Sequence, residues 1–117
     1  MQRDVDHMRV RGEGASEPLI TNEEDIHVAS RALKAMAHPL RLKILCIVGG
    51  RTEVCVQEIV KQAGTSQSNI SQHLSIMREK GILAFRKDAN KVYYRLGDAR
   101  VVKLIESLLD TFCRSRV

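Results

Sequence analysis

The stretch VQEIVKQAGTSQSNISQHLSIMREKG, residues 56–81, decides the fold of this chain. Apolar residues in its first part recur at helical spacing and stop at Gly64, a residue type that commonly ends helices. Thr65 or Ser66 can then cap a second helix, whose apolar residues fall on one side at i, i+4 and i+7 from Ile70. Two short helices joined by a tight turn that contains glycine form a helix-turn-helix.

The other face of this second helix carries hydroxyl and amide side chains instead of the Glu and Lys of an ordinary solvated helix. Such groups both donate and accept hydrogen bonds, as the base edges in a major groove require. This face therefore favours base reading, and plain solvent exposure is the alternative. The side chains concerned are Gln67, Ser68, Ser71, Gln72 and Ser75.

A β-hairpin is predicted next, because residues 82–96 contain two runs rich in β-branched and aromatic residues around the polar DANK at 88–91. The tip of the hairpin is basic, so we expect a wing that contacts phosphates without reading the sequence. Taken singly, each cation is more commonly a solvated charge, and together they fit a wing. The phosphate contacts expected from the helix end and the hairpin are Arg78, Lys80, Arg86, Lys87 and Lys91.

Three further helical patterns flank this region. The first, residues 23–37, follows a capping Thr21 or Asn22, and Pro39 opens the second, which ends at a pair of glycines. The third starts at a capping Asp98 and has a wider apolar surface than one core-facing stripe needs. A second apolar face on a terminal helix predicts a partner helix, most simply from a homodimer.

The composition fits one small domain with a single core, since the chain has 117 residues of which 44% are hydrophobic. Residues 1–21 show no sustained periodicity, so we expect a disordered or loosely attached arm, followed by one domain over residues 22–117. No apolar run approaches the roughly 20 residues that span a bilayer, which favours a soluble, cytoplasmic protein without a membrane partner.

The net charge of +5 is unevenly distributed along the chain. Residues 1–30 hold three Arg against seven Asp or Glu, a net charge of −4, which leaves +9 for residues 31–117. The part expected to fold is therefore strongly basic. A basic compact domain favours an anionic partner, first of all nucleic acid.

Four segments together resemble the ArsR/SmtB family of dimeric winged-helix bacterial repressors. They are LKAMAHPLRLKIL at 33–45, EVCVQEI at 53–59, TSQSNISQHLSIMREKGIL at 65–83 and RKDANKVYYRL at 86–96. The resemblance covers residues 22–113. It implies a mainly α (α+β) fold, a homodimeric winged helix-turn-helix with five helices and a β-hairpin wing, and double-stranded DNA with an imperfect palindromic operator as the partner.

The resemblance also implies roles for individual residues. In that family the helix that carries SQSNISQH enters the major groove, which implies base or backbone contacts for Gln67, Ser68, Ser71, Gln72 and His73. The family's dimer forms largely through its first and last helices. The interface residues expected from this are Ile26, Leu33, Val101, Leu104, Ile105, Leu108, Leu109 and Phe112.

The metal sites of the family are poorly matched here. One is a Cys-Val-Cys, of which this chain keeps Cys55 but has Gln57 at the second position, and a soft metal or arsenite needs two or three converging thiolates. The other matches Asp98, Arg100, Thr111 and Arg114, of which only the aspartate could ligate. We therefore expect no metal and no cofactor, and a metal- or arsenite-responsive repressor that uses Cys55 is the alternative.

Cys46, in LKILC, and Cys113, in TFC, resemble the two cysteines of the BigR/SqrR/HlyU branch of the family, which respond to reactive sulfur species or oxidants. The simpler interpretation is packing, because free cysteine is often buried as a small apolar residue. The mechanism we expect starts from a thiolate, favoured by Lys43, Arg114 or Arg116, which is modified and then resolved by the second cysteine into a disulfide or a bridge with extra sulfur. The modified protein would release DNA.

Two other classes of function fit the sequence less well. A thiol enzyme is disfavoured, because the chain has no Cys-x-x-Cys motif and neither His38 nor His73 has an evident pairing with Cys46. A winged helix that binds a protein and not DNA is the second alternative. Salt distinguishes it, since phosphate contacts make affinity fall steeply as the salt concentration rises.

Overall fold

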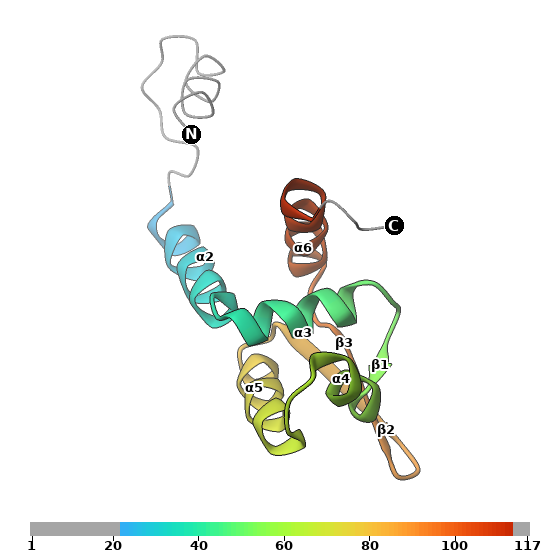
Figure 1. The fold of residues 1–117 in the computed structure, drawn as a ribbon. Coiled ribbons are helices and arrows are strands. Elements are labelled where there is room, and N and C mark those ends of the chain that lie inside the picture. The colour runs from blue at the N-terminus through green and yellow to red at the C-terminus, as the bar shows by residue number, and fades with distance from the viewer. Residues whose placement is uncertain (1–21, 114–117) are drawn as a thin grey trace. The chain divides into compact units, whose positions relative to one another are not determined.

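The structure is a computed structural model that describes residues 22–113. The chain divides into two compact units between Arg31 and Ala32, inside helix α2, and the second unit holds every later element (Figure 1). The helices are α2 (Glu23–Met36), α3 (Pro39–Gly49), α4 (Val56–Ala63), α5 (Gln67–Glu79) and α6 (Ala99–Phe112), and the strands are β1 (Val54–Cys55), β2 (Leu83–Asp88) and β3 (Lys91–Leu96). The predicted five helices and hairpin are confirmed within the described residues, whereas the predicted arm at residues 1–21 lies outside them.

The helices begin and end where the sequence places caps and breakers. The Oδ1 atom of Asn22 accepts a hydrogen bond of 2.7 Å from the backbone N–H of Glu24 at the start of α2. His38 caps α3 in the same way, since its Nδ1 accepts from the N–H of Leu40 at 3.1 Å, ahead of the proline in the first turn. Gly64 ends α4 with φ of 77°, a left-handed conformation that favours glycine.

A three-stranded antiparallel sheet of order β1-β3-β2 supports the hairpin. The two hairpin strands pair from Leu83 with Leu96 to Asp88 with Lys91, and a two-residue turn joins them. Strand β1 adds Val54 opposite Tyr94 on the other edge of β3. The sequence predicted the hairpin alone, because a strand of two residues shows no alternation that a pattern can register.

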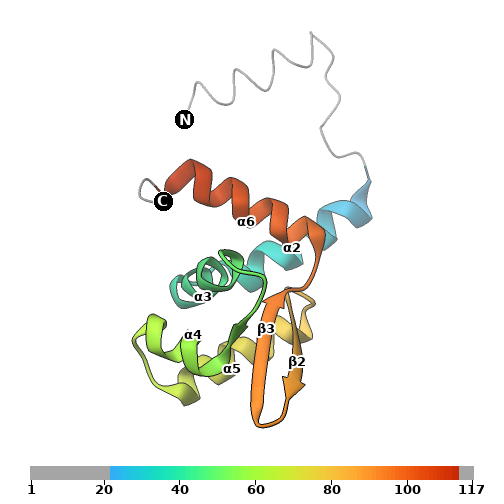
Figure 2. The same cartoon turned by 90° about the vertical axis from the view of Figure 1, so that its right-hand side faces the viewer.

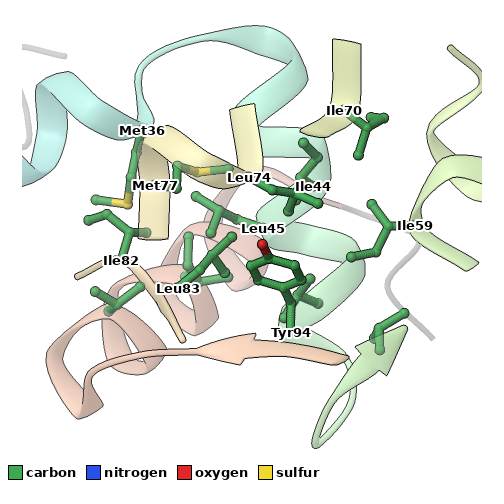
Figure 3. Close-up of a cluster of buried hydrophobic side chains, with 14 of the residues drawn as sticks. Met36, Ile44, Leu45, Ile59, Ile70, Leu74, Met77, Ile82, Leu83 and Tyr94 are labelled. Atoms are coloured by element: carbon green, nitrogen blue, oxygen red, sulfur yellow. The ribbon is translucent and has the colours of Figure 1, made fainter. Parts of the chain in front are cut away.

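The core lies between the helices and the sheet of the second unit. Figure 3 shows apolar side chains of α3 and α5 pointing toward one another, with the ring of Tyr94 from β3 beside them. Loss of a side chain here leaves a cavity, because interiors are close-packed. The largest fully buried side chains are Ile44, Leu45, Val48, Ile59, Ile70, Leu74, Met77, Leu83 and Ile105.

Helix α3 separates two sides of the second unit. In both views α6 lies on one side of α3, while α5 and the turn of the hairpin lie on the other (Figures 1 and 2). The approach of α6 is close, since a Cβ at Gly49 would lie 3.2 Å from the Cγ2 of Ile105. Helix α5 and the basic hairpin tip are therefore on the same side of the unit.

Candidate nucleic-acid interface

The turn between α4 and α5 is held by side chains of its own residues. The Oγ of Ser66 accepts a hydrogen bond of 3.2 Å from the N–H of Asn69, which confirms Ser66 as the cap of α5. The Nδ2 of Asn69 in turn donates to the Oγ1 of Thr65 at 3.3 Å. These local bonds fix the point at which α5 begins and so the direction in which its first turn points.

Helix α5 has one buried face and one polar face. Ile70, Leu74 and Met77 are at most 1% exposed and anchor the helix in the core, as their spacing predicted. The four residues predicted to read bases all have exposed side chains, while Ser75 is half-buried: Gln67, Ser68, Ser71 and Gln72. An exposed row of hydroxyls and amides on a rigid helix can present donors and acceptors together.

The basic side chains of the hairpin fall into two kinds. Lys87 and Lys91 are exposed near its turn, as predicted. Arg86, predicted as a phosphate contact, is engaged within the chain: its Nε and Nη2 donate to Glu53 at 2.9 and 2.5 Å, and its Cζ lies 4.5 Å from the centroid of Tyr93. This bidentate pair lowers the pKa of Glu53 and raises that of the guanidinium.

Sequence reasoning missed the partner of Arg86, because Glu53 lies 33 residues earlier in the chain. The pair connects the segment before β1 with β2 on the opposite edge of the sheet. Arg86 therefore braces the hairpin although its side chain is still 46% exposed, and Lys87 and Lys91 are exposed near the tip as well.

Arg78 is also partly engaged. It is half-buried on α5, and its Cζ lies 4.7 Å from the centroid of the Phe85 ring on β2. The Phe85 ring stacks in turn on Tyr94, with centroids 5.8 Å apart. A cation over an aromatic face is attracted by the ring quadrupole, so this contact helps to join α5 to the hairpin.

A cluster of two histidines and an arginine lies where α3 begins. The Nε of Arg41 donates to the Nδ1 of His73 on α5 at 3.0 Å, and its Nη1 donates to the carbonyl of Ala35 in α2 at 2.9 Å. The rings of His38 and His73 are 4.7 Å apart between centroids, with their planes inclined by 40°. His73 was predicted as a DNA contact, and the structure shows its Nδ1 occupied by Arg41.

The three cysteines differ in exposure. Cys46 on α3 and Cys55 at the start of α4 are half-buried, whereas Cys113, directly after α6, is exposed, and all three are free thiols. Burial raises the pKa of Cys46, and negative charge on Cys113 raises it further. Cys46 lies on α3, which packs against α6, and Cys113 directly follows α6.

The expectation that neighbouring cations favour a thiolate is wrong for Cys46, because the pKa of this thiol is raised. The Nζ of Lys43 is engaged elsewhere, since it donates to the carbonyl of Ala63 at the end of α4 at 3.0 Å. Arg114 and Arg116 lie outside the described residues. Between residues 22 and 113, no three His, Cys, Asp or Glu side chains gather as they would around a metal ion.

The residues of the predicted dimer interface differ in exposure, and the interface itself stays a prediction. Val101 and Ile105 are 7% and 1% exposed, so assigning them to the interface was wrong, because the core of their own unit already covers them. Leu109 is partly buried against the same core, and Leu108 is half-buried. The expected interface residues with exposed side chains are Ile26 at 43%, Leu33 at 54%, Leu104 at 38% and Phe112 at 76%.

Comparison with known proteins places this geometry in a family. A family model for bacterial regulatory proteins of the arsR family matches residues 38–84, from the cap of α3 into β2. The biofilm growth-associated repressor of Xylella fastidiosa is 35% identical over 92 residues, which cover 78% of this chain and 79% of that protein.

No helix between residues 22 and 113 combines the length and the apolar character needed to cross a membrane.

Solved structures agree with this assignment. HlyU from Vibrio cholerae is 38% identical, with a TM-score of 0.76 over 80% of this chain and all of that chain. A structure described as reduced HlyU from the same organism gives 38% identity and a TM-score of 0.75 over 79% of this chain and 96% of that one. The chain therefore belongs to the ArsR family of bacterial regulatory proteins and is a winged-helix transcriptional regulator of the DNA-binding type, not an enzyme.

Proposed function

We propose that this regulator represses transcription by holding an operator with α5 and the hairpin tip, and that modification of Cys46 and Cys113 releases the DNA. The observation that supports the proposal is the packing of α3, which carries Cys46, against α6, which ends directly before Cys113. Cys46 lies on α3, which also packs on α5, so a bridge between the two thiols would act on an element next to the helix proposed to read bases.

The difference in exposure between the two thiols supports different roles for them in the proposed reaction. Exposed Cys113 reacts first, because its sulfur meets the reagent in solution, and half-buried Cys46 then resolves the product. With a peroxide, the Cys113 thiolate attacks one oxygen, the other leaves as hydroxide, and a sulfenic acid forms. Attack by the Cys46 sulfur on this acid expels water and leaves a disulfide, with both thiols oxidised and the peroxide reduced.

A polysulfide follows the same order. The Cys113 thiolate attacks a sulfane sulfur, breaks a sulfur–sulfur bond and releases a shorter sulfide chain, which leaves Cys113 with extra sulfur. Attack by Cys46 on that chain expels hydrosulfide and closes a bridge of two or more sulfurs. Either bridge would connect α3 to the segment after α6.

We further propose that the working form is a homodimer that binds an imperfect palindrome. Leu33 on α2, and Leu104 and Phe112 on α6, expose apolar side chains that a second copy would cover. Two copies of α5 would then meet half-sites about one turn of DNA apart, so their spacing decides operator affinity. A bridge that shifts α6 against α3 would change this spacing.

Intact mass with cysteine mapping tests the thiol switch. Reduced protein selects duplexes from a random-sequence pool, and the selected duplex is then titrated before and after treatment with polysulfide or peroxide. We expect a link between Cys46 and Cys113 that forms in step with loss of DNA binding. Cys55→Ser is the matched control, since it removes a half-buried thiol that the mechanism does not use.

Two results would contradict the thiol switch. One is a Cys46→Ser protein that still loses operator affinity on treatment. The other is release of DNA on adding arsenite or a divalent metal while all cysteines stay unmodified, which would favour the metal-responsive alternative that uses Cys55.

A further inference from the structure

Arg41 connects three helices through one side chain. It lies in the first turn of α3, one of its nitrogens donates to the carbonyl of Ala35 in the last turn of α2, and another donates to His73 on α5. The two bonds are 2.9 and 3.0 Å long, within the ordinary range for such donors. The guanidinium thus ties α5 to the junction between α2 and α3.

The bond to His73 needs a neutral ring. A guanidinium only donates, so the Nδ1 of His73 must offer a lone pair, and the ring proton must sit on Nε2. The Nδ1 of His38 is also an acceptor, since it takes the N–H of Leu40. Protonation of the His73 Nδ1 would replace the acceptor with a donor facing a permanent cation.

The surroundings of His73 oppose that protonation. Its partial burial, His38 and Arg41 all lower its pKa from the usual 6.5. The charged and titratable groups that act on the ring are these two side chains, both from the junction before or within α3. For a base whose folded pKa is lowered, the stabilising bond is fully present above pH 6.5 and is lost as the pH falls through the folded value.

We propose that Arg41, acting through neutral His73, is a positioning residue that sets the orientation of α5 for operator recognition, and that a proton on His73 releases it. Nothing in this proposal needs the thiol switch, but it rests on the proposed role of α5 as the reading helix. The readout is the ratio of operator affinity to affinity for a scrambled duplex. A proton on the ring adds a similar attraction to any DNA, which raises both affinities alike and cancels in this ratio.

The first experiment measures this ratio with reduced protein at about pH 7.5 and at the lowest pH at which circular dichroism shows the protein still folded, at constant ionic strength, because the lowered pKa of His73 places its protonation below the ordinary histidine range. We expect the ratio to fall by about tenfold or more in acid, which corresponds to about 1.4 kcal/mol. His73→Leu, which has no acceptor, should have a low ratio at both pH values. His73→Asn carries an amide oxygen near the position of Nδ1 and should recover part of the lost ratio without the pH dependence.

His38 needs its own control, because it also titrates and caps α3. His38→Asn keeps a capping oxygen and removes the ring, so the fall in acid should persist. A ratio that is independent of pH in the wild type, a normal ratio in His73→Leu, or loss of the pH effect in His38→Asn would each overturn the proposal.

The second experiment needs no DNA. An NMR titration of the His73 ring should show its pKa rising toward 6.5 in Arg41→Gln, because that substitution removes a neighbouring cation. An unchanged pKa would overturn the positioning role alone, even if the protein selects DNA. The expected pKa change in a protein that selects no duplex would instead overturn the reading role of α5, and this inference with it.

Discussion

Helices α5 and α6 both pack on α3, yet they expose opposite kinds of surface. The exposed side chains of α5 include two glutamines and two serines, Gln67, Ser68, Ser71 and Gln72, whereas those of α6 include two large apolar residues, Leu104 and Phe112, among charged and polar ones. Each helix starts with a side-chain cap, from Ser66 and Asp98 respectively. Both helices therefore begin at a capping side chain and pack apolar residues into the core. They differ in their exposed residues, which favour contact with DNA on α5 and contact with a second copy of the chain on α6.

The largest difference between the two helices is expected in stability, when one leucine on each helix is replaced by alanine. Leu74 of α5 is 1% exposed, so Leu74→Ala should lower the free energy of unfolding by about 2–5 kcal/mol. Leu104→Ala on α6 should change the stability of the monomer by about 0.5 kcal/mol or less, because that side chain is 38% exposed. It should instead raise the concentration at which copies associate, measured by sedimentation; equal losses of unfolding free energy would contradict the assignment of faces.

Removal of one amide from α5 tests whether its polar face contributes to operator affinity. Gln72→Ala should cost about 1–3 kcal/mol of operator affinity and relax the preference at one base pair, if the amide reads a base. Gln57→Ala is the matched control, since this glutamine is exposed on α4. Competition binding with single-base variants of the operator measures both effects, and similar losses for the two substitutions would argue against base reading.

The cap of α5 should matter less than its buried face. Ser66→Ala removes the oxygen that accepts from the N–H of Asn69 and should cost about 1 kcal/mol of stability, with Ser66→Asp close to the wild type. Denaturant unfolding gives the value. A loss of similar size in Ser68→Ala, which makes no such cap, would point to an effect of the helix as a whole.

The cap of α6 should show a pH dependence. Asp98 accepts from the N–H of Arg100 and pairs with its guanidinium, which lowers the carboxyl pKa from 3.8 to about 2. A lowered acid contributes stability above pH 3.8 that is lost as the pH falls toward 2. Thermal unfolding of the wild type and Asp98→Asn should therefore converge in acid, and a constant gap between them would show that the charge plays no part.

The sequence predicted most of the fold because its signals are local. Caps at Asn22, Ser66 and Asp98, the proline at 39 and the apolar spacing of α5 each involve residues a few positions apart. The exposed polar side chains of α5 could be predicted for the same reason.

Contacts between distant segments were missed. Strand β1 exists through its pairing with β3, Arg86 is engaged by Glu53, and Arg41 occupies His73 across 32 positions of sequence. No spacing rule encodes such pairs. The assignment of Val101 and Ile105 to the interface failed likewise, since a wide apolar surface on α6 does not reveal which part the core of the same chain covers.

In the proposed thiol switch, the half-buried position of Cys46 would determine how long a signal must last. Since only a thiolate attacks sulfur quickly, its raised pKa would slow closure of the bridge after Cys113 had reacted. During that delay, ordinary cellular thiols can restore Cys113. A brief burst of reagent would then be erased, and only sustained exposure would complete the link, so that the thiol pair would respond to the duration of a chemical stress as well as to its strength.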